Sequence, residues 1–215
     1  MKKVNVKLVG IALVLCAIGL WCRNTVKVNA LEKEESEAII LSEIIAKKES
    51  TKALENANVD KSFDENIEHF FWNNKKNVGM SSVGFIKCDK YNIDTPLSFG
   101  GENEKVLLGS CGIHRDLSDT RHLTVLGHNC ERYSKLKDKL FTNIKYLNVG
   151  DKVEMDTPFG LYNLVVEKTV YVSPSEYRNN NYSVVLEGDV SFATCEWHGK
   201  EKGRRIVYLR VDSLE

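Results

Sequence analysis

The sequence predicts a mainly β domain, either a closed barrel or a sandwich, preceded by a helical extension. From Val83 onward, short runs of β-branched and aromatic residues alternate with clusters of Gly, Asn and Asp, which is typical of strands and turns. In residues 31–57 there is no Gly or Pro, and apolar residues recur at helical spacing. The 215 residues suffice for one domain with an appendage, but not for two ordinary domains and a linker.

Eight strands are expected in the β domain, with one helical piece at 133–147 among them. The expected strands are 83–88, 94–99, 105–110, 123–129, 152–157, 160–173, 189–196 and 204–212. The helical extension has a second amphipathic stretch at 63–73, whose aromatic stripe is expected to pack against the body. The predicted division is therefore residues 1–30 for a cytoplasmic tail and membrane segment, 31–78 for the helical extension, and 79–215 for the β domain.

The N-terminal segment has the pattern of a membrane anchor or an export signal. Leu8 to Cys22 is uncharged, almost wholly apolar, and follows three lysines. Lysines before an apolar run place the N-terminus in the cytoplasm and the following chain outside. Val28-Asn29-Ala30 resembles a signal-peptide cleavage site, but its distance from Cys22 favours an uncleaved, single-pass anchor.

Charge and cysteine content limit the classes of function. Lys plus Arg and Asp plus Glu number 30 each, so the chain has no general attraction to nucleic acid, and no nucleic-acid partner is expected. The exported part holds Cys88, Cys111, Cys130 and Cys195. An even number allows disulfides in an oxidising compartment. Four cysteines in a body of this size are not dense, so at least one thiol is expected to serve in chemistry.

Three segments carry residues suited to chemistry at strand ends. One strand ends in Gly127-His128, a later one ends in Thr194-Cys195, and the last begins with two arginines, Arg204 and Arg205. A glycine beside the imidazole permits close approach of another group to the backbone. Each segment alone is weak evidence, since a histidine, cysteine or arginine in such a place is more often structural.

Taken together, these segments resemble the sortase family, the surface transpeptidases of Gram-positive bacteria. The resemblance runs from Val83 to Val211, and it includes the opening strands at 83–86 and 92–97. It implies a closed eight-stranded barrel in which a cysteine, a histidine and an arginine meet at one end. Carried over to this sequence, these catalytic residues are Cys195, His128 and Arg205.

The choice between the two arginines rests on position in the strand. Arg204 and Arg205 point to opposite faces because side chains alternate along a strand, so one of them reaches Cys195. The family places its arginine directly before an aliphatic run, which favours Arg205 before Ile206-Val207. The ten-residue step from Cys195 also resembles some class B members. Arg204 stays open as the alternative.

The resemblance implies a thiol transpeptidase that needs neither a metal nor a cofactor. The Cys195 thiolate would attack a peptide carbonyl and form a thioester, while Arg205 stabilises the oxyanion. His128 would protonate the leaving amine and deprotonate the incoming one. The implied substrate is a secreted protein with a C-terminal sorting signal, and the acceptor is an amine of peptidoglycan or its precursor. The alternatives are a hydrolytic cysteine endopeptidase and a non-catalytic surface barrel that binds peptides.

The sequence departs from the family in places. None of Pro96, Pro158 and Pro174 lies in an Asp-Pro-aromatic lid, which speaks against the pilus-assembling class. The helical extension is more similar to class B than to class A.

Other cysteines and histidines leave alternatives open. A zinc site made of residues from Cys111, His114, His128 and Cys130 has unusual spacings. Cys130 or Cys111 could pair oxidatively, with each other or with Cys195, and His198 is a rival to His128. His122 is expected at the surface.

Overall fold

A computed structural model describes residues 6–55, 82–101, 104–114, 122–133, 136–158, 160–179 and 189–215, and within the first helix it leaves the side chains of 6–24, 26–28 and 31 undescribed. The chain divides into two compact units, Met1–Ala38 and Ile39–Glu215. The expected boundary between residues 78 and 79, and the aromatic stretch 63–73, fall outside the described residues.

The first unit consists of the N-terminal part of α1, a single helix that runs from Val6 to Glu55. Its last turns therefore belong to the second unit. The apolar run from Leu8 to Cys22 lies in this helix, but its side chains are among those not described. In the part of the chain whose placement is described, no helix has the length and apolar character that crossing a membrane requires.

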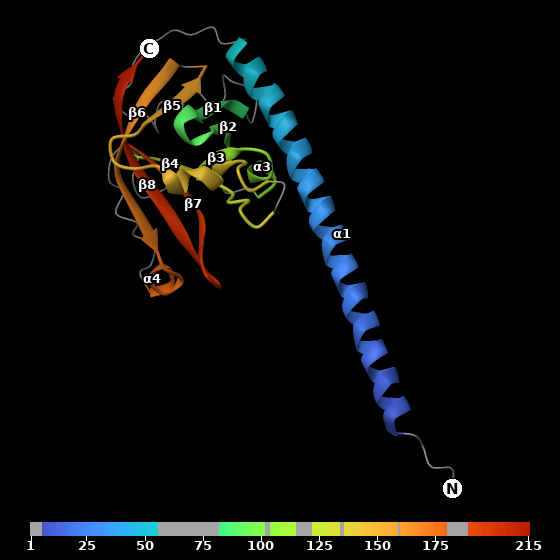
Figure 1. The fold of residues 1–215 in the computed structure, drawn as a ribbon. Helices are drawn as coiled ribbons and strands as arrows, with labels where there is room; N and C mark the ends of the chain where they lie inside the picture. The colour runs from blue at the N-terminus through green and yellow to red at the C-terminus, as the bar shows by residue number, and fades with distance from the viewer. Residues whose placement is uncertain are drawn as a thin grey trace. The chain divides into compact units, whose positions relative to one another are not determined.

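The second unit contains a closed barrel of eight strands (Figure 1). The strands are β1 (Ser82–Cys88), β2 (Ile93–Phe99), β3 (Cys111–His114), β4 (Leu123–Gly127), β5 (Lys152–Thr157), β6 (Gly160–Val172), β7 (Val190–His198) and β8 (Glu201–Leu214). Around the barrel they follow the order β1-β2-β3-β4-β7-β8-β6-β5. Neighbours pair antiparallel except β2 with β3 and β4 with β7, which are parallel. This confirms the expected mainly β fold and, of the two architectures considered, the barrel.

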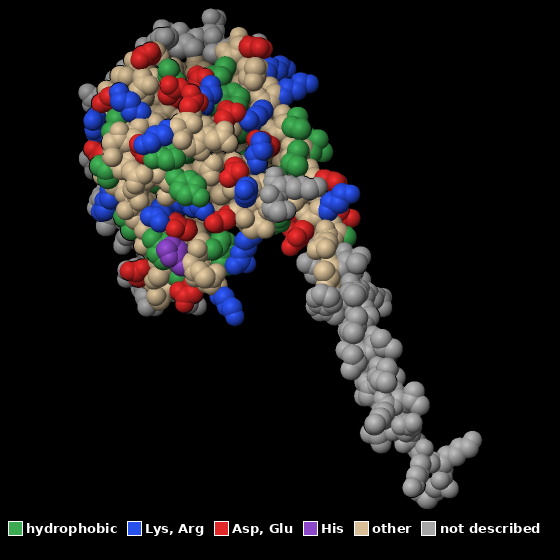
Figure 2. Space-filling view, in the orientation of Figure 1, with side chains coloured by type: hydrophobic (Ala, Val, Ile, Leu, Met, Phe, Trp, Pro, Cys, Tyr) green, Lys and Arg blue, Asp and Glu red, His purple; other side chains and the backbone are tan. Residues whose placement is uncertain are grey.

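The barrel interior is filled by large apolar side chains from alternating strand positions. Phe192 of β7 is fully buried and packs on Phe141, with ring centroids 5.3 Å apart. Each such side chain contributes about 1.5–3 kcal/mol through burial. Lys, Arg, Asp and Glu are interspersed on the face seen in Figure 2. The core thus fixes which strand residues point inward, and with them which point out of the barrel.

Two expected elements differ from the structure. The run 105–110 was expected as a strand, but α3 (Glu104–Leu107) lies there and the strand follows as β3. Periodicity alone does not separate a short apolar strand from a helical turn. Among the described residues of the expected helix at 133–147, the 3₁₀ helix η2 (Phe141–Tyr146) is the only helical segment. Leu140, just before it, has φ of 53° and ψ of −133°, which no helix accommodates.

The described part of the second unit also contains two short helices, η1 (Asp89–Tyr91) and α4 (Pro174–Asn179). The end of α1 that belongs to this unit turns small or polar side chains inward, among them buried Ala46 and Ala53. A Cβ added at Gly109 would lie 2.2 Å from the backbone of Ser42, so the helix approaches closely there. Lys47 Nζ lies 2.6 Å from an Asp94 oxygen, which adds a polar tie to the barrel.

Candidate active site

His128 and Cys195 lie at matching positions of two neighbouring parallel strands. His128 follows the last residue of β4, whereas Cys195, expected at a strand end, lies inside β7, which runs on to His198. In the register of β4 and β7, Gly127 pairs with Thr194, and the two residues of interest follow directly. The buried Thr194 hydroxyl donates a hydrogen bond to the Gly127 carbonyl at 2.7 Å, which locks this register. Because parallel strands point the same way, the imidazole and the thiol arrive at one end of the barrel.

The backbone just after His128 is held from two sides. The Asn129 amide nitrogen donates to the carbonyl of Cys195 at 2.7 Å, which ties the two segments together. The Phe141 N–H donates to the carbonyl of His128 at 3.2 Å. A Cβ at Gly127 would lie 2.5 Å from the Phe141 ring, so this glycine is required by close packing. The histidine is thus positioned by the barrel core rather than by a loose loop.

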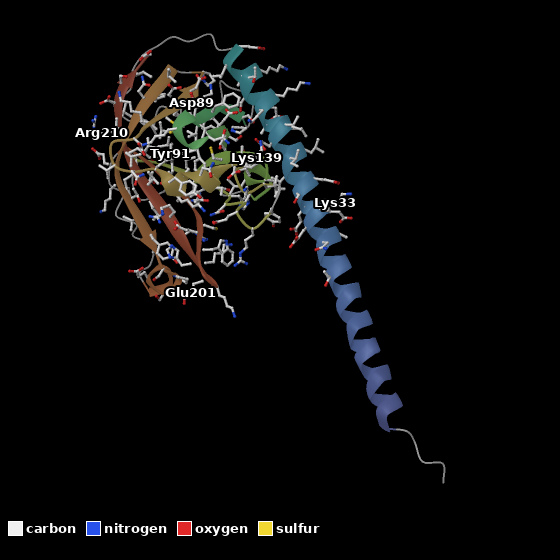
Figure 3. The ribbon with its side chains drawn as sticks, in the orientation of Figure 1. Lys33, Asp89, Tyr91, Lys139, Glu201 and Arg210 are labelled. Carbon is white, nitrogen blue, oxygen red and sulfur yellow. The ribbon has the colours of Figure 1, made fainter. Side chains whose placement is uncertain are left out.

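The strand register decides which arginine faces the thiol. β8 pairs antiparallel with β7, and Arg204 lies directly opposite Cys195. Opposed residues of an antiparallel pair project to the same face. The Arg204 Nη1 atom donates to Cys195 Sγ at 3.2 Å and also to the Gly203 carbonyl at 3.3 Å. Figure 3 labels Glu201 at the start of β8 and Arg210 farther along, and Arg204 lies near the Glu201 end.

Arg205, expected to reach the thiol, lies on the other face of β8. Its guanidinium forms two hydrogen bonds with the Glu196 carboxylate, at 2.5 and 2.9 Å, and a third with the Thr169 hydroxyl at 3.2 Å. The structure therefore differs from the expectation based on the aliphatic run. That position in sequence says nothing about which residue of β8 is opposite Cys195 in β7.

Glu196 is the acceptor of a charged network on that second face. His198 Nε2 lies 2.9 Å from its carboxylate, and the His198 ring stacks on Tyr171 at 4.0 Å. Burial alone would raise the pKa of the Glu196 carboxyl, but the hydrogen bonds and charges of Arg205 and His198 outweigh it and lower the pKa. His198, the rival histidine, is thus bound to this carboxylate.

A pocket of about 280 Å³ opens beside the thiol. It is lined by Ile39, Leu108, His128, Asn129, Cys130, Arg132, Tyr133, Cys195, Trp197 and Lys202. Cys195 and His128 are both half-buried, and both border this space. A half-buried thiol beside a histidine, with a guanidinium donating to its sulfur, is an arrangement suited to nucleophilic attack on a carbonyl. Stabilisation of the resulting oxyanion by the same guanidinium is the matching chemistry.

Cys88, Cys111 and Cys130 are buried thiols. Cys111 lies in the barrel core and donates to the Pro96 carbonyl at 3.2 Å, and burial raises its pKa well above the ordinary value. Cys130 lies in a separate apolar cluster with Ile39, and burial, aided by the charge of Glu43, raises its pKa to about 11. Within the described part of the chain, no group of His, Cys, Asp and Glu is arranged to hold a metal.

Some residues of the site were not singled out from the sequence. Asn129 and Trp197 each lie within two residues of a predicted catalytic residue, so proximity in sequence was an available signal. His122, expected at the surface, is buried and hydrogen-bonded to the Ser191 hydroxyl at 2.9 Å. Pairing of β4 with β7 buries it, and one strand's sequence does not show that pairing.

A closed β-barrel that carries a half-buried thiol with a guanidinium donor is the arrangement expected of a barrel-type cysteine enzyme. A model of the sortase domain matches residues 86–212. This chain therefore belongs to the sortase family, and the function that follows is that of a cysteine transpeptidase.

Solved structures of other sortases have the same fold. Sortase C1 of Streptococcus agalactiae is 26% identical, with 63% of this chain and 70% of that chain covered and a TM-score of 0.50. Sortase C of Streptococcus pneumoniae is 15% identical, with coverage of 86% and 98% and a TM-score of 0.51. A lid mutant of sortase A from Corynebacterium diphtheriae is 14% identical, with coverage of 86% and 96% and a TM-score of 0.52. In a comparison with curated protein sequences, none matched. The expected class B likeness stays a prediction.

Proposed function

We propose that Cys195 is the nucleophile of this transpeptidase, His128 its general acid and base, and Arg204 the group that stabilises the oxyanion. The observation that carries this assignment is the 3.2 Å contact from Arg204 Nη1 to Cys195 Sγ, beside the strand end that bears His128. The guanidinium donates to the same sulfur that attacks the carbonyl, so it is placed to interact with the oxyanion that forms there.

The reaction follows from these positions. Cys195 Sγ attacks the carbonyl carbon of the scissile peptide bond, and Arg204 donates hydrogen bonds to the oxygen as it gains negative charge. His128 gives a proton to the departing amine, leaving a thioester on Cys195. An incoming amine then loses a proton to His128 and displaces the sulfur. Water in place of the amine gives hydrolysis, which is the alternative outcome of the same intermediate.

The substrate proposed is a secreted protein with a C-terminal sorting signal, and the acceptor an amine of the cell wall. The catalytic unit is proposed to act outside the cell, held by an uncleaved N-terminal anchor with its start in the cytoplasm. The support for the anchor is the sequence alone: lysines followed by the apolar run of Leu8 to Cys22. Protease treatment of intact cells tests this orientation. An epitope tag added before Met1 should resist the protease if the N-terminus is cytoplasmic, while the catalytic unit should be digested if it lies outside.

Cleavage of a peptide library by the full-length protein, compared with Cys195→Ala, tests the assignment. Cys88→Ala is the matched control, since it also removes one thiol but from the barrel core. Cleavage at one motif by wild type and the control, and none by Cys195→Ala, is the expected result. Adding a glycine peptide then separates the outcomes, because transpeptidation gives a joined product and hydrolysis does not. Full cleavage by Cys195→Ala would refute Cys195 as the nucleophile, and absence of cleavage by wild type would favour the non-catalytic barrel.

A further inference from the structure

The pocket beside the thiol carries positive charge on one wall. Arg132 lies over the Trp197 ring, with its guanidinium carbon 3.2 Å from the ring centroid. Lys202, opposite Trp197 in the pairing of β7 and β8, places its ammonium 5.7 Å from the same centroid. Two cations therefore flank one indole, and the π-face supports both of them.

No carboxylate in the described part of the chain neutralises this wall. None of the described residues that line the pocket is Asp or Glu. Glu131, next to Arg132 in the chain, bonds instead to Lys145 at 2.7 Å. Glu196 is turned to the other face of β7, where it binds Arg205.

One further acid lies near the pocket floor. Glu43, whose charge acts on Cys130, is held between Lys47 at 3.4 Å and Lys139 at 3.7 Å. Its side chain is only 8% exposed, so it does not reach the pocket mouth. The exposed side chains of Arg132 and Lys202 are thus available for an anion supplied by a ligand.

The spacing relates this wall to the reacting atoms. Trp197 follows Cys195 by two residues on the same face of β7, a distance of about 6.6 Å along the strand. His128 borders the same pocket, and in the proposed reaction it deprotonates the incoming amine. A molecule that fills the pocket with its amine at the thioester therefore sets its other end, roughly two residues away, beside Arg132 and Lys202.

We infer that this pocket binds the acyl acceptor and selects amines that carry a carboxylate about one dipeptide length from the nitrogen. The inference rests on the proposed function, in which a thioester on Cys195 forms first and an amine then attacks it. The amine nitrogen forms a bond to the thioester carbon as the carbon–sulfur bond breaks. The electron pair returns to Cys195 Sγ, and His128 takes the proton from nitrogen. Arg132 and Lys202 hold the carboxylate and do not touch the reacting atoms.

The first test compares glycylglycine with glycylglycinamide as acceptors for the full-length protein in mild detergent. The measured quantity is the ratio of kcat/KM for the acid over kcat/KM for the amide. The double variant Arg132→Gln/Lys202→Gln should lower this ratio about fivefold, as expected for partly exposed ion pairs. Lys200→Gln, an exposed lysine at the β7–β8 turn, should leave it unchanged. Any difference in intrinsic reactivity between the two amines affects this ratio equally in every variant, so it cancels when the variants are compared.

The second test needs no turnover. Iodoacetamide labelling of Cys195 is followed by mass spectrometry in the presence of Nα-acetyl-glycylglycine, or of its amide. Protection by the acid alone, lost in the double variant, supports the inference. Equal effects of acid and amide, or protection that survives in the double variant, overturn it. Absence of any cleavage by wild type would instead refute the proposed function, and the labelling result would still decide the pocket.

Discussion

Replacing each of the two neighbouring arginines separates a catalytic role from a structural one. Arg204→Gln removes the charged donor at Cys195 Sγ. Loss of one preorganised oxyanion donor lowers kcat by about 100- to 1,000-fold. Arg204 also bonds the carbonyl of its chain neighbour Gly203, and losing this one part-buried hydrogen bond costs less stability than breaking the ion pair of Arg205. We therefore expect a large fall in kcat with a melting temperature close to that of wild type.

Arg205→Gln should show the opposite balance. The side chains of Arg205 and Glu196 are 18% and 11% exposed, so the pair is mostly buried. Removing one partner of a buried pair costs about 3–5 kcal/mol, and the remaining exposure reduces this to about 2–3 kcal/mol. For a body of this size, that lowers the melting temperature by about 4–12 °C. Below this temperature, its kcat should stay well above that of Arg204→Gln.

For both variants at the same pH, thermal unfolding followed by circular dichroism gives the melting temperature, and single-substrate kinetics gives kcat. The double variant Arg204→Gln/Arg205→Gln is the control. If the two roles are independent, it should combine the fall in kcat of the first variant with the fall in melting temperature of the second. A fall of kcat in Arg205→Gln equal to that in Arg204→Gln, with no change in melting temperature, would refute the assignment and restore Arg205 as the oxyanion donor.

Three further predictions follow from contacts around the site. Because the folded state lowers the Glu196 pKa below its ordinary 4.5, the carboxylate stabilises the fold above that value, and this stability is lost as pH falls through the lowered pKa. The difference in melting temperature between wild type and Glu196→Gln should thus shrink from pH 7 toward pH 3; a constant difference contradicts this. Gly127→Ala should lower the free energy of unfolding by about 1–3 kcal/mol through overpacking against Phe141, and it should also lower kcat. Gly150→Ala is the control for backbone strain, because Gly150 has a φ of 88° and a Cβ there would contact no other atom. At pH 8, iodoacetamide should modify Cys195 well before Cys130, whose pKa is about 11; equal rates in native protein would show that Cys130 is not buried.

Most of the barrel was predictable because its strands are marked locally. Val153, Met155 and Thr157 alternate with polar neighbours in β5, which is the period-two pattern of a half-buried strand. The strand predicted at 105–110 was wrong because a short apolar run fits a helical turn as well as a strand. The helix predicted at 133–147 was wrong because Leu140 adopts a left-handed φ of 53°, which interrupts any helix across that position.

The sequence by itself determined which residues carry the proposed chemistry: a cysteine and a histidine on two strands of the barrel, two arginines near the start of the last strand, and the order that resembles the sortase family. Only the tertiary structure decided which arginine touches the sulfur and which cations line the pocket. Side chains alternate along a strand, so a register shift of one residue moves an arginine to the opposite face. That register is set where β7 turns into β8 at Gly199 and Lys200, so that His198 pairs with Glu201 and Cys195 with Arg204.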